Sequence, residues 1–316
     1  PGVWFVSGLN GSIQSGSNAA INLTTDSLVM EPGAINAGSG TVTIQNRSTG
    51  TLIDVGGTSA DALASPLKLG VSSAELARIT AGTVVVGRND ATASGNVTVN
   101  ATNMGAMGNT SGNLTVLSGG LLTVSGAVTK TAGSEANLTL RANKDISVAS
   151  NTTISTASEP LNVVMNANLG NAGGGVILNS GAGVTTKGGD ITMTGGGAAT
   201  AAVLTHAGVF LTNATLDATG VEGGNISLTG TSNANAPVGT SGYDGVRVAV
   251  GGAIKTSGAV NITIQGTNPT KFASLSKGVV ISEAKVSGGS SGTVSITGDS
   301  STSTTTTSYI YGVMFS

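Results

Sequence analysis

The sequence predicts an all-β chain that winds into a right-handed parallel β-helix, a β-solenoid of about ten coils with three short strands in each. Two observations predict this fold class. A short pattern returns along the chain in which apolar residues occupy the same two alternate positions. The pattern also returns at a regular interval of 24 or 25 residues in much of the first half. Such strands can bury their apolar faces only against copies of themselves in neighbouring coils.

The pattern is clearest in residues 224–230, Gly-Asn-Ile-Ser-Leu-Thr-Gly. In an extended strand Ile226 and Leu228 point to one face, and the polar residues beside them point to the other. Glycine at each end lets the chain turn. The same alternation recurs at Asn96–Val99, Asn113–Val116, Asn137–Leu140, Asp190–Met193, Asn261–Ile264 and Thr293–Ile296.

The chain is predicted to form a single solenoid domain over residues 1–316, in four stretches. Residues 1–60 and 82–174 hold regular coils, and residues 61–81 interrupt the rhythm as a helical insertion. Ser72 and Glu75 have the spacing of a capping box, so a short helical excursion is predicted near residues 72–80. Strands resume at Thr83.

Residues 175–316 are predicted to form larger coils. Glycine followed by valine opens successive coils, at intervals of 33, 37, 33 and 34 residues. The additional residues collect before each Gly-Val pair, as in 231–244 and 299–310, and are expected to form surface loops. The pairs begin at Gly175, Gly208, Gly245, Gly278 and Gly312.

Composition excludes several functional classes. The 13 basic and 15 acidic residues give a net charge of −2, which is not the basic surface that nucleic acids or anionic membranes attract. There is no cysteine, so disulfides and thiolate metal sites are excluded. No stretch reaches the roughly 18 consecutive apolar residues of a membrane span, and no membrane insertion is predicted. The chain opens at Pro1 without a secretory signal, which indicates a mature or excised piece of a longer protein.

Catalytic residues are not gathered in any recurring pattern. A polysaccharide-cleaving solenoid needs several acids converging on one groove, but here the acids lie in different coils, mostly beside turns. The only histidine is His206, so neither a histidine metal cluster nor a nucleophilic triad is supported. We therefore predict a non-enzymatic protein without metal or cofactor. The acids considered are Asp54, Asp90, Asp145, Asp190, Asp217, Asp244 and Asp299.

Two stretches carry a family resemblance. Residues 34–44, Ala-Ile-Asn-Ala-Gly-Ser-Gly-Thr-Val-Thr-Ile, and residues 71–83, followed by 95–99, resemble the filamentous-haemagglutinin-type large exoproteins. The resemblance implies a secreted parallel β-helical rod on a bacterial surface, serving adhesion and cell–cell association. The Asn-Pro-Asn motifs of that family's secretion domain are absent, so the resemblance implies the rod and not the export module.

A column of asparagines precedes the third strand of several coils. If these residues stack, their side-chain amides can hydrogen-bond from coil to coil and fix the register of the strands. This predicted ladder is structural, and it consists of Asn96, Asn113, Asn137, Asn225 and Asn261.

The Gly-Val strands predict a second column. If Val176 and Leu178 face the core, the residue between them faces outward, and the same register places one residue of each later coil beside it. An exposed apolar stripe of this kind marks a contact surface, unless the preceding loops fold over it. The predicted stripe consists of Ile177, Phe210, Val280 and Met314, interrupted by Arg247.

The ends of the chain predict self-assembly. No aromatic residue lies between positions 6 and 209, and neither end shows the polar cap that a solenoid needs. The start, Gly2-Val3-Trp4-Phe5, and the end, Gly312-Val313-Met314-Phe315, are versions of one strand, as at equivalent cuts through a longer array. The predicted subunit interface comprises Val3, Trp4, Phe5, Tyr309, Tyr311, Val313, Met314 and Phe315.

The expected function is mechanical: an extracellular or cell-surface rod whose copies stack head to tail into a filament, with lateral contact between rods as a further option. One alternative is an adhesin that binds surface glycans through its C-terminal loops and Tyr243, Tyr309 and Tyr311. The other is a polysaccharide lyase or hydrolase, which clustered acids in a groove would indicate.

Overall fold

The computed structural model is nearly all-β, with parallel strands repeated from coil to coil. It falls into two compact units, and each is described by itself. Unit 1 comprises 1–141 with 153–162, and unit 2 comprises 142–152 with 163–316. The described residues are 3–4, 11–63, 65–90, 92–107, 112–157, 159–169, 173–196, 207–232, 244–269, 277–300 and 311–316.

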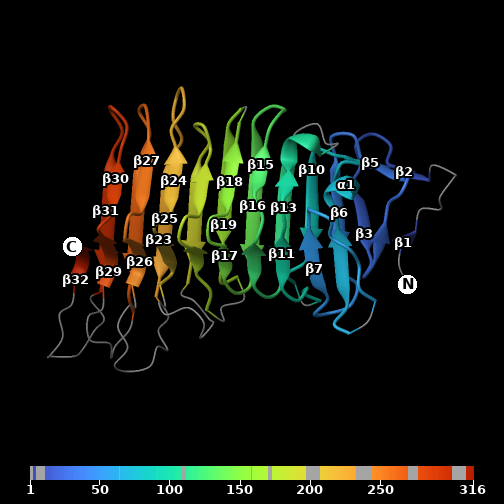
Figure 1. Cartoon of the computed structure of the whole chain (residues 1–316), viewed down its shortest axis with the longest axis horizontal. Coiled ribbons are helices and arrows are strands. Elements are labelled where there is room, and N and C mark those ends of the chain that lie inside the picture. The colour runs from blue at the N-terminus through green and yellow to red at the C-terminus, as the bar shows by residue number, and fades with distance from the viewer. Residues whose placement is uncertain are drawn as a thin grey trace. The chain divides into compact units, whose positions relative to one another are not determined.

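Unit 1 repeats a winding of three strands (Figure 1). The first strands of its coils are β1 (Val3–Trp4), β4 (Leu28–Val29), β7 (Leu52–Val55), β11 (Val97–Val99) and β14 (Leu122–Val124). The second strands are β2 (Ser12–Gln14), β5 (Ala34–Asn36), β9 (Ile79–Thr80), β12 (Thr102–Asn103), β15 (Val128–Lys130) and β18 (Thr153–Thr156). The third strands are β3 (Ile21–Thr24), β6 (Thr41–Gln45), β10 (Thr83–Gly87), β13 (Asn113–Ser118) and β16 (Ala136–Ala142), of which Ala142 belongs to unit 2. A short 3-10 helix, η1 (Met104–Ala106), follows β12.

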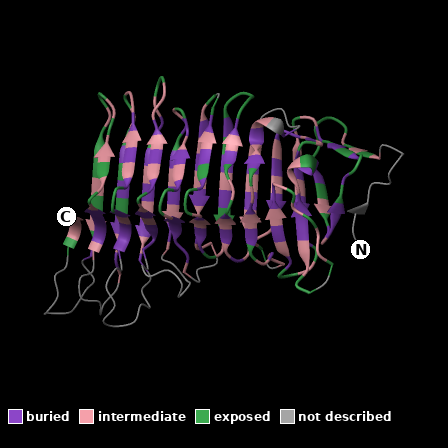
Figure 2. Cartoon of the chain, viewed as in Figure 1, coloured by how far each residue is buried: buried purple, intermediate pink, exposed green. Residues whose placement is uncertain are grey.

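The alternation in the sequence builds the core of unit 1. In the parallel sheet β6–β10–β13, Val42, Val84 and Leu114 stand opposite one another, and all three are fully buried. The polar residues between the buried ones face away from the core, which produces the alternating bands of Figure 2. Each coil therefore shelters the apolar side chains of the next, as the sequence predicts.

The insertion of residues 61–81 is part helix and part strand. The helix α1 (Ser73–Leu76) begins at the predicted capping box of Ser72 and Glu75. It is shorter than predicted, because Ile79 pairs with Ile35 in a parallel sheet and is fully buried there. Before the helix, β8 (Lys68–Val71) pairs in parallel with β7.

Two carboxylates of the insertion satisfy backbone groups of β4 and of Met30, which directly follows it; β4 pairs only with β1 among the described strands. Asp61 Oδ2 accepts the Leu28 N–H at 2.9 Å, and Glu75 Oε1 accepts the Met30 N–H at 3.3 Å. Asp61 Oδ1 also accepts the Gly70 N–H of β8 at 2.8 Å. We call this edge of β4 the seam of unit 1. Along it, side-chain carboxylates of the insertion accept the N–H hydrogen bonds that the carbonyls of a neighbouring strand would otherwise accept.

Unit 2 repeats the same winding. The first strands are β17 (Ile146–Val148), β20 (Val176–Leu178), β23 (Val209–Thr212), β26 (Asp244–Ala249), β29 (Lys277–Ser282) and β32 (Tyr311–Phe315). The second strands are β21 (Gly183–Thr185), β24 (Thr215–Ala218), β27 (Ala253–Thr256) and β30 (Lys285–Ser287). The third strands are β19 (Leu161–Asn166), whose first two residues belong to unit 1, β22 (Ile191–Gly195), β25 (Ile226–Thr231), β28 (Ile262–Thr267) and β31 (Val294–Asp299).

Glycines allow two stretches of backbone to approach closely at one corner of unit 2. Gly230, near the end of β25, lies so close to Gly245 at the start of β26 that a Cβ on Gly230 would stand 2.0 Å from the Gly245 carbonyl oxygen. The same close approach repeats between Gly266 and Gly278. The recurrent Gly-Val pair therefore marks a corner where two backbones touch.

The predicted fold class, an all-β parallel solenoid with three strands per coil and a short helical excursion, is confirmed. The assignment of residues 1–316 to one domain stays a prediction.

Candidate interaction surface

The asparagine ladder is present in unit 1. Asn113 Oδ1 accepts the backbone N–H of Asn137 at 2.9 Å and its side-chain amide at 3.0 Å. Asn137 Oδ1 in turn accepts the side-chain amide of Asn162 at 3.2 Å. Each rung joins equivalent positions of consecutive coils, so the ladder fixes register as predicted.

Unit 2 carries a separate ladder of the same kind. Asp190 Oδ1 accepts the backbone N–H of Asn225 at 2.7 Å. Asn225 Oδ1 accepts that of Asn261 at 3.0 Å, and Asn261 Oδ1 accepts that of Thr293 at 2.9 Å. In every rung the oxygen of the earlier coil receives the N–H of the later coil.

Asn96 does not belong to either ladder. It precedes β11, a first strand, whereas the ladder residues precede or begin third strands. Its Oδ1 accepts the Leu121 N–H at 3.0 Å, so it performs the same task at another corner. The sequence motif around Asn96 is the same in both strand types, which is why residue type alone did not separate them.

The predicted outward column of unit 2 has the expected register. Ile177 stands opposite Phe210, Phe210 opposite Arg247, Arg247 opposite Val280, and Val280 opposite Met314. The column is not an open apolar stripe, however. Ile177 and Val280 are each only 3% exposed, and Phe210 and Met314 are half-buried. The two smaller side chains lie beside longer ones one strand away, which accounts for part of this shielding.

A charged group lies beside this column. Asp244 begins β26 with a fully buried side chain, and its Oδ2 accepts a hydrogen bond from Arg247 Nη1 at 3.3 Å. Burial raises the pKa of Asp244, against the opposing effect of the positive charges of Lys277 and Arg247. Among the described residues, Asp244 Oδ1 and Arg247 Nε have no hydrogen-bond partner. An ion pair with these orphaned atoms is a costly arrangement in a protein interior.

The last described coil of unit 2 is open on one side. The strands β30, β31 and β32 each stand last in the order of their sheets (Figure 1). Val294, which stands opposite the fully buried Ile262, is 42% exposed, and Phe315, opposite the buried Ile281, is 68% exposed. Among the described strands, none lies beyond β30, β31 and β32 to cover these core-side residues.

An open hollow of about 680 Å³ lies at the same end. It is lined by residues 251–253, Ile281, residues 283–285, Phe315 and Ser316. The backbone ladder continues to its rim, since Ser316 N–H donates to the Ile281 carbonyl at 3.1 Å. The open coil and this hollow form the best candidate for a contact surface in the described chain.

The remaining predicted interface residues divide into two groups. Val3 and Trp4 form β1 and pair with Leu28 and Val29, whereas Phe5 and Tyr309 lie outside the described residues. Tyr311 is 41% exposed, and Val313 and Met314 are half-buried. Tyr243 and His206 also lie outside the described residues, so glycan recognition through the C-terminal loops stays a prediction.

The acids considered for catalysis occupy separate places in the fold. Asp54 pairs with Lys68 at 3.0 Å, and Asp217 pairs with Lys255 at 2.8 Å. The buried Asp145 accepts the Gly175 N–H at 2.8 Å. Within the part of the chain that the structure describes, no three His, Cys, Asp or Glu residues are grouped as metal ligands would be.

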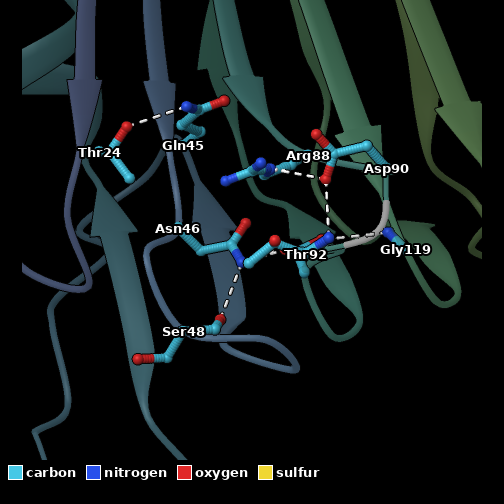
Figure 3. A network of polar contacts seen from close by, with 9 residues as sticks. Thr24, Gln45, Asn46, Ser48, Arg88, Asp90, Thr92 and Gly119 are labelled. Carbon is cyan, nitrogen blue, oxygen red and sulfur yellow. Dashed lines mark hydrogen bonds and ion pairs between the residues drawn. The ribbon is translucent and has the colours of Figure 1, made fainter.

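Polar corner networks account for several other conspicuous side chains. In unit 1, the amide of the fully buried Asn46 donates to the carbonyls of Ser48 and Thr92 at 2.8 and 3.0 Å (Figure 3). Nearby, Arg88 Nε donates to Asp90 Oδ1 at 2.7 Å. Asp90 Oδ1 also accepts the Thr92 N–H at 2.9 Å, so the contacts of the Arg88–Asp90 pair are those of a turn.

The seam carboxylate Asp61 is the residue that the sequence analysis missed most clearly. The capping-box spacing identified Glu75 but not the hydrogen bond that it accepts from the Met30 N–H. The available signal was the position of these two acids, because charged residues make up only 9% of the chain and both acids fall in the insertion that breaks the repeat.

A comparison with known protein families, with curated proteins and with solved structures finds no match. Among the described residues, no helix has both the length and the apolar character needed to cross a bilayer.

Proposed function

We propose that this chain is a non-enzymatic structural protein of the cell surface or extracellular space, in which solenoid units add end to end into a filament. The observation that supports this proposal is the open last coil of unit 2. Its core-side residues Val294 and Phe315 are exposed at strands that, among those described, have a neighbour on one side only. An uncovered parallel edge of this kind is a template for another strand.

The chemistry of the edge favours a further solenoid coil as the partner. Ile296, half-buried on β31, stands opposite the fully buried Ile264, so the apolar core continues to the open side of the last described coil. A coil with the same alternation would bury this surface with the same geometry that buries Ile264. A copy of this chain supplies such coils. The resemblance to filamentous-haemagglutinin-type exoproteins leads to the same expectation for a secreted bacterial rod.

Assembly can be tested with a matched pair of variants. Ile296→Asp places a charge at the core side of the edge, whereas Thr297→Asp places it on the exposed outer side of the same strand. Wild type and Thr297→Asp are expected to give oligomers whose mass grows with concentration in light scattering, and filaments in negative-stain images. Ile296→Asp is expected to remain monomeric with an unchanged circular dichroism spectrum. A wild-type chain that stays monomeric at high concentration overturns the proposal.

A further inference from the structure

The first and last described strands of the chain have equivalent places in the winding. β1 is a first strand that pairs with the next first strand, β4, with Val3 opposite Leu28 and Trp4 opposite Val29. β32 is also a first strand, and Val313 and Met314 stand opposite Val279 and Val280 of the preceding one, β29. The sequence Gly-Val-x-Phe occurs at both places, at residues 2–5 and 312–315. They are therefore two candidates for one position beside β4.

The two strands differ in the neighbour that each one holds. Within the described residues, β1 pairs with β4 and β32 pairs with β29, from Tyr311 to Phe315. Each therefore has a described neighbour on one side only. β32 can take the place of β1 beside β4 without losing its own pairing with β29.

The other strands of the end coils are complementary in pattern. At the open end, Val286 of β30 and Val294 and Ile296 of β31 lie on the core side, opposite buried residues of the preceding coil. At the beginning of unit 1, Ile13 of β2 and Leu23 of β3 are half-buried on the core side. Strands β2 and β3 could therefore cover β30 and β31 with apolar residues against apolar residues.

On this basis we propose that copies of the chain join through a composite coil, an inference that rests on the filament proposed above. β32 of one copy supplies the first strand, and β2 and β3 of the next copy supply the second and third. β32 then lies between its own β29 and the β4 of the next copy, in the place of that copy's β1. The outward column continues through the joint from Val280 and Met314 to Val29 of the next copy, and Val29 is 41% exposed in the single chain.

Cysteine cross-linking tests the proposed neighbours, because the native chain has no cysteine. Adjacent parallel strands lie about 4.8 Å apart, within the roughly 4.4–6.8 Å between Cα atoms that a disulfide spans. A mixture of the Val29→Cys chain and the Met314→Cys chain should form a disulfide-linked heterodimer on oxidation. The double variant should give a ladder of dimers, trimers and longer products on a non-reducing gel.

The matched control replaces Met314→Cys with Val280→Cys, one strand further from the joint. Two strand spacings, about 9.6 Å, are too far for a disulfide, so this mixture should cross-link at least tenfold less. A second arm pairs Trp4→Cys with Met314→Cys, which should stay unlinked if β32 takes the place of β1.

The outcomes separate this inference from the proposed function. Filaments with the Val29–Met314 cross-link support both. Filaments that lack this cross-link, or that link Trp4→Cys to Met314→Cys instead, overturn the composite coil and leave the filament standing. A wild-type chain that forms no filament, with no cross-link in the variants, overturns both.

Discussion

Asn225 Oδ1 accepts the backbone N–H of Asn261 at 3.0 Å, although the two residues are 36 positions apart in the chain. They occupy the same place in consecutive coils of unit 2, and Asn225 itself is held in the same way by Asp190. The relationship shows how a side chain can set the register between strands that are remote in sequence. It also makes the ladder open to direct measurement.

Asn225→Ala removes this acceptor and its own side-chain bond to Asp190. Because each hydrogen bond contributes roughly 0.5–1.5 kcal/mol, the variant should lose about 1–2 kcal/mol of stability. Urea unfolding followed by circular dichroism measures the change. Ser227→Ala, on the outer face of the same strand, is the matched control and should stay within about 0.5 kcal/mol of wild type. Equal losses in the two variants would contradict a special role for the ladder.

Gly230→Ala tests the close corner of unit 2. The added Cβ would meet the Gly245 carbonyl oxygen at 2.0 Å, and backbone must shift to make room. We expect a loss of about 2 kcal/mol or more, as for other substitutions that force backbone strain. Gly16→Ala is the control, since a Cβ there meets nothing within 4 Å. The prediction fails if the midpoints of urea unfolding fall by similar amounts in both variants.

Asp244→Asn tests the buried charge beside Arg247. Burial raises the pKa of Asp244 above its unfolded value, so the folded chain binds its proton more tightly than the unfolded chain. The contribution of this group to stability therefore falls as the pH rises from the unfolded pKa through the folded one. Asparagine keeps the shape without the charge, so the Asp244→Asn variant should be more stable than wild type at pH 7.

The measurement is the free energy of unfolding of both chains between pH 4 and pH 7. The advantage of Asp244→Asn over wild type should grow across this range. If the variant is less stable at pH 7, the attraction of Arg247 and Lys277 outweighs the cost of burial.

Asp61→Ala tests the seam of unit 1. The carboxylate accepts hydrogen bonds from Ser27 Oγ at 2.6 Å, the Leu28 N–H at 2.9 Å and the Gly70 N–H at 2.8 Å. Its loss leaves backbone donors without partners, at a cost of roughly 2–3 kcal/mol. Hydrogen exchange should show the Leu28 amide losing protection, while amides in β10 keep theirs. Asp90→Ala, at an exposed turn, should leave the Leu28 amide unchanged.

Alternation made the strands and the core of this protein predictable. Apolar residues such as Val42 and Ile226 recur at every second position of short strands. Stacking these strands in a parallel sheet buries such residues in every coil. The register of the outward column from Ile177 to Met314 was predictable for the same reason, because the Gly-Val pairs mark equivalent places in each coil.

The burial of individual side chains, and the strand type to which a residue belongs, were less predictable. The sequence around Asn96 reads like that around Asn113, and only the three-dimensional winding assigns them to different strand types. The burial of Ile177 depends on neighbours outside its own strand. Asp61 reaches Leu28 across 33 positions through an insertion that breaks the repeat, so no periodic signal connects them.

The asparagine ladder of unit 2 gives that unit a direction. Every rung has its oxygen in the earlier coil and its N–H in the later one, so the two faces of a coil are chemically unlike, one an acceptor and the other a donor. A joint that prolongs this sequence of rungs must bring unlike faces together. Fibres built by such joints would be polar, with two distinguishable ends. Two fibres could not join through ends of the same kind.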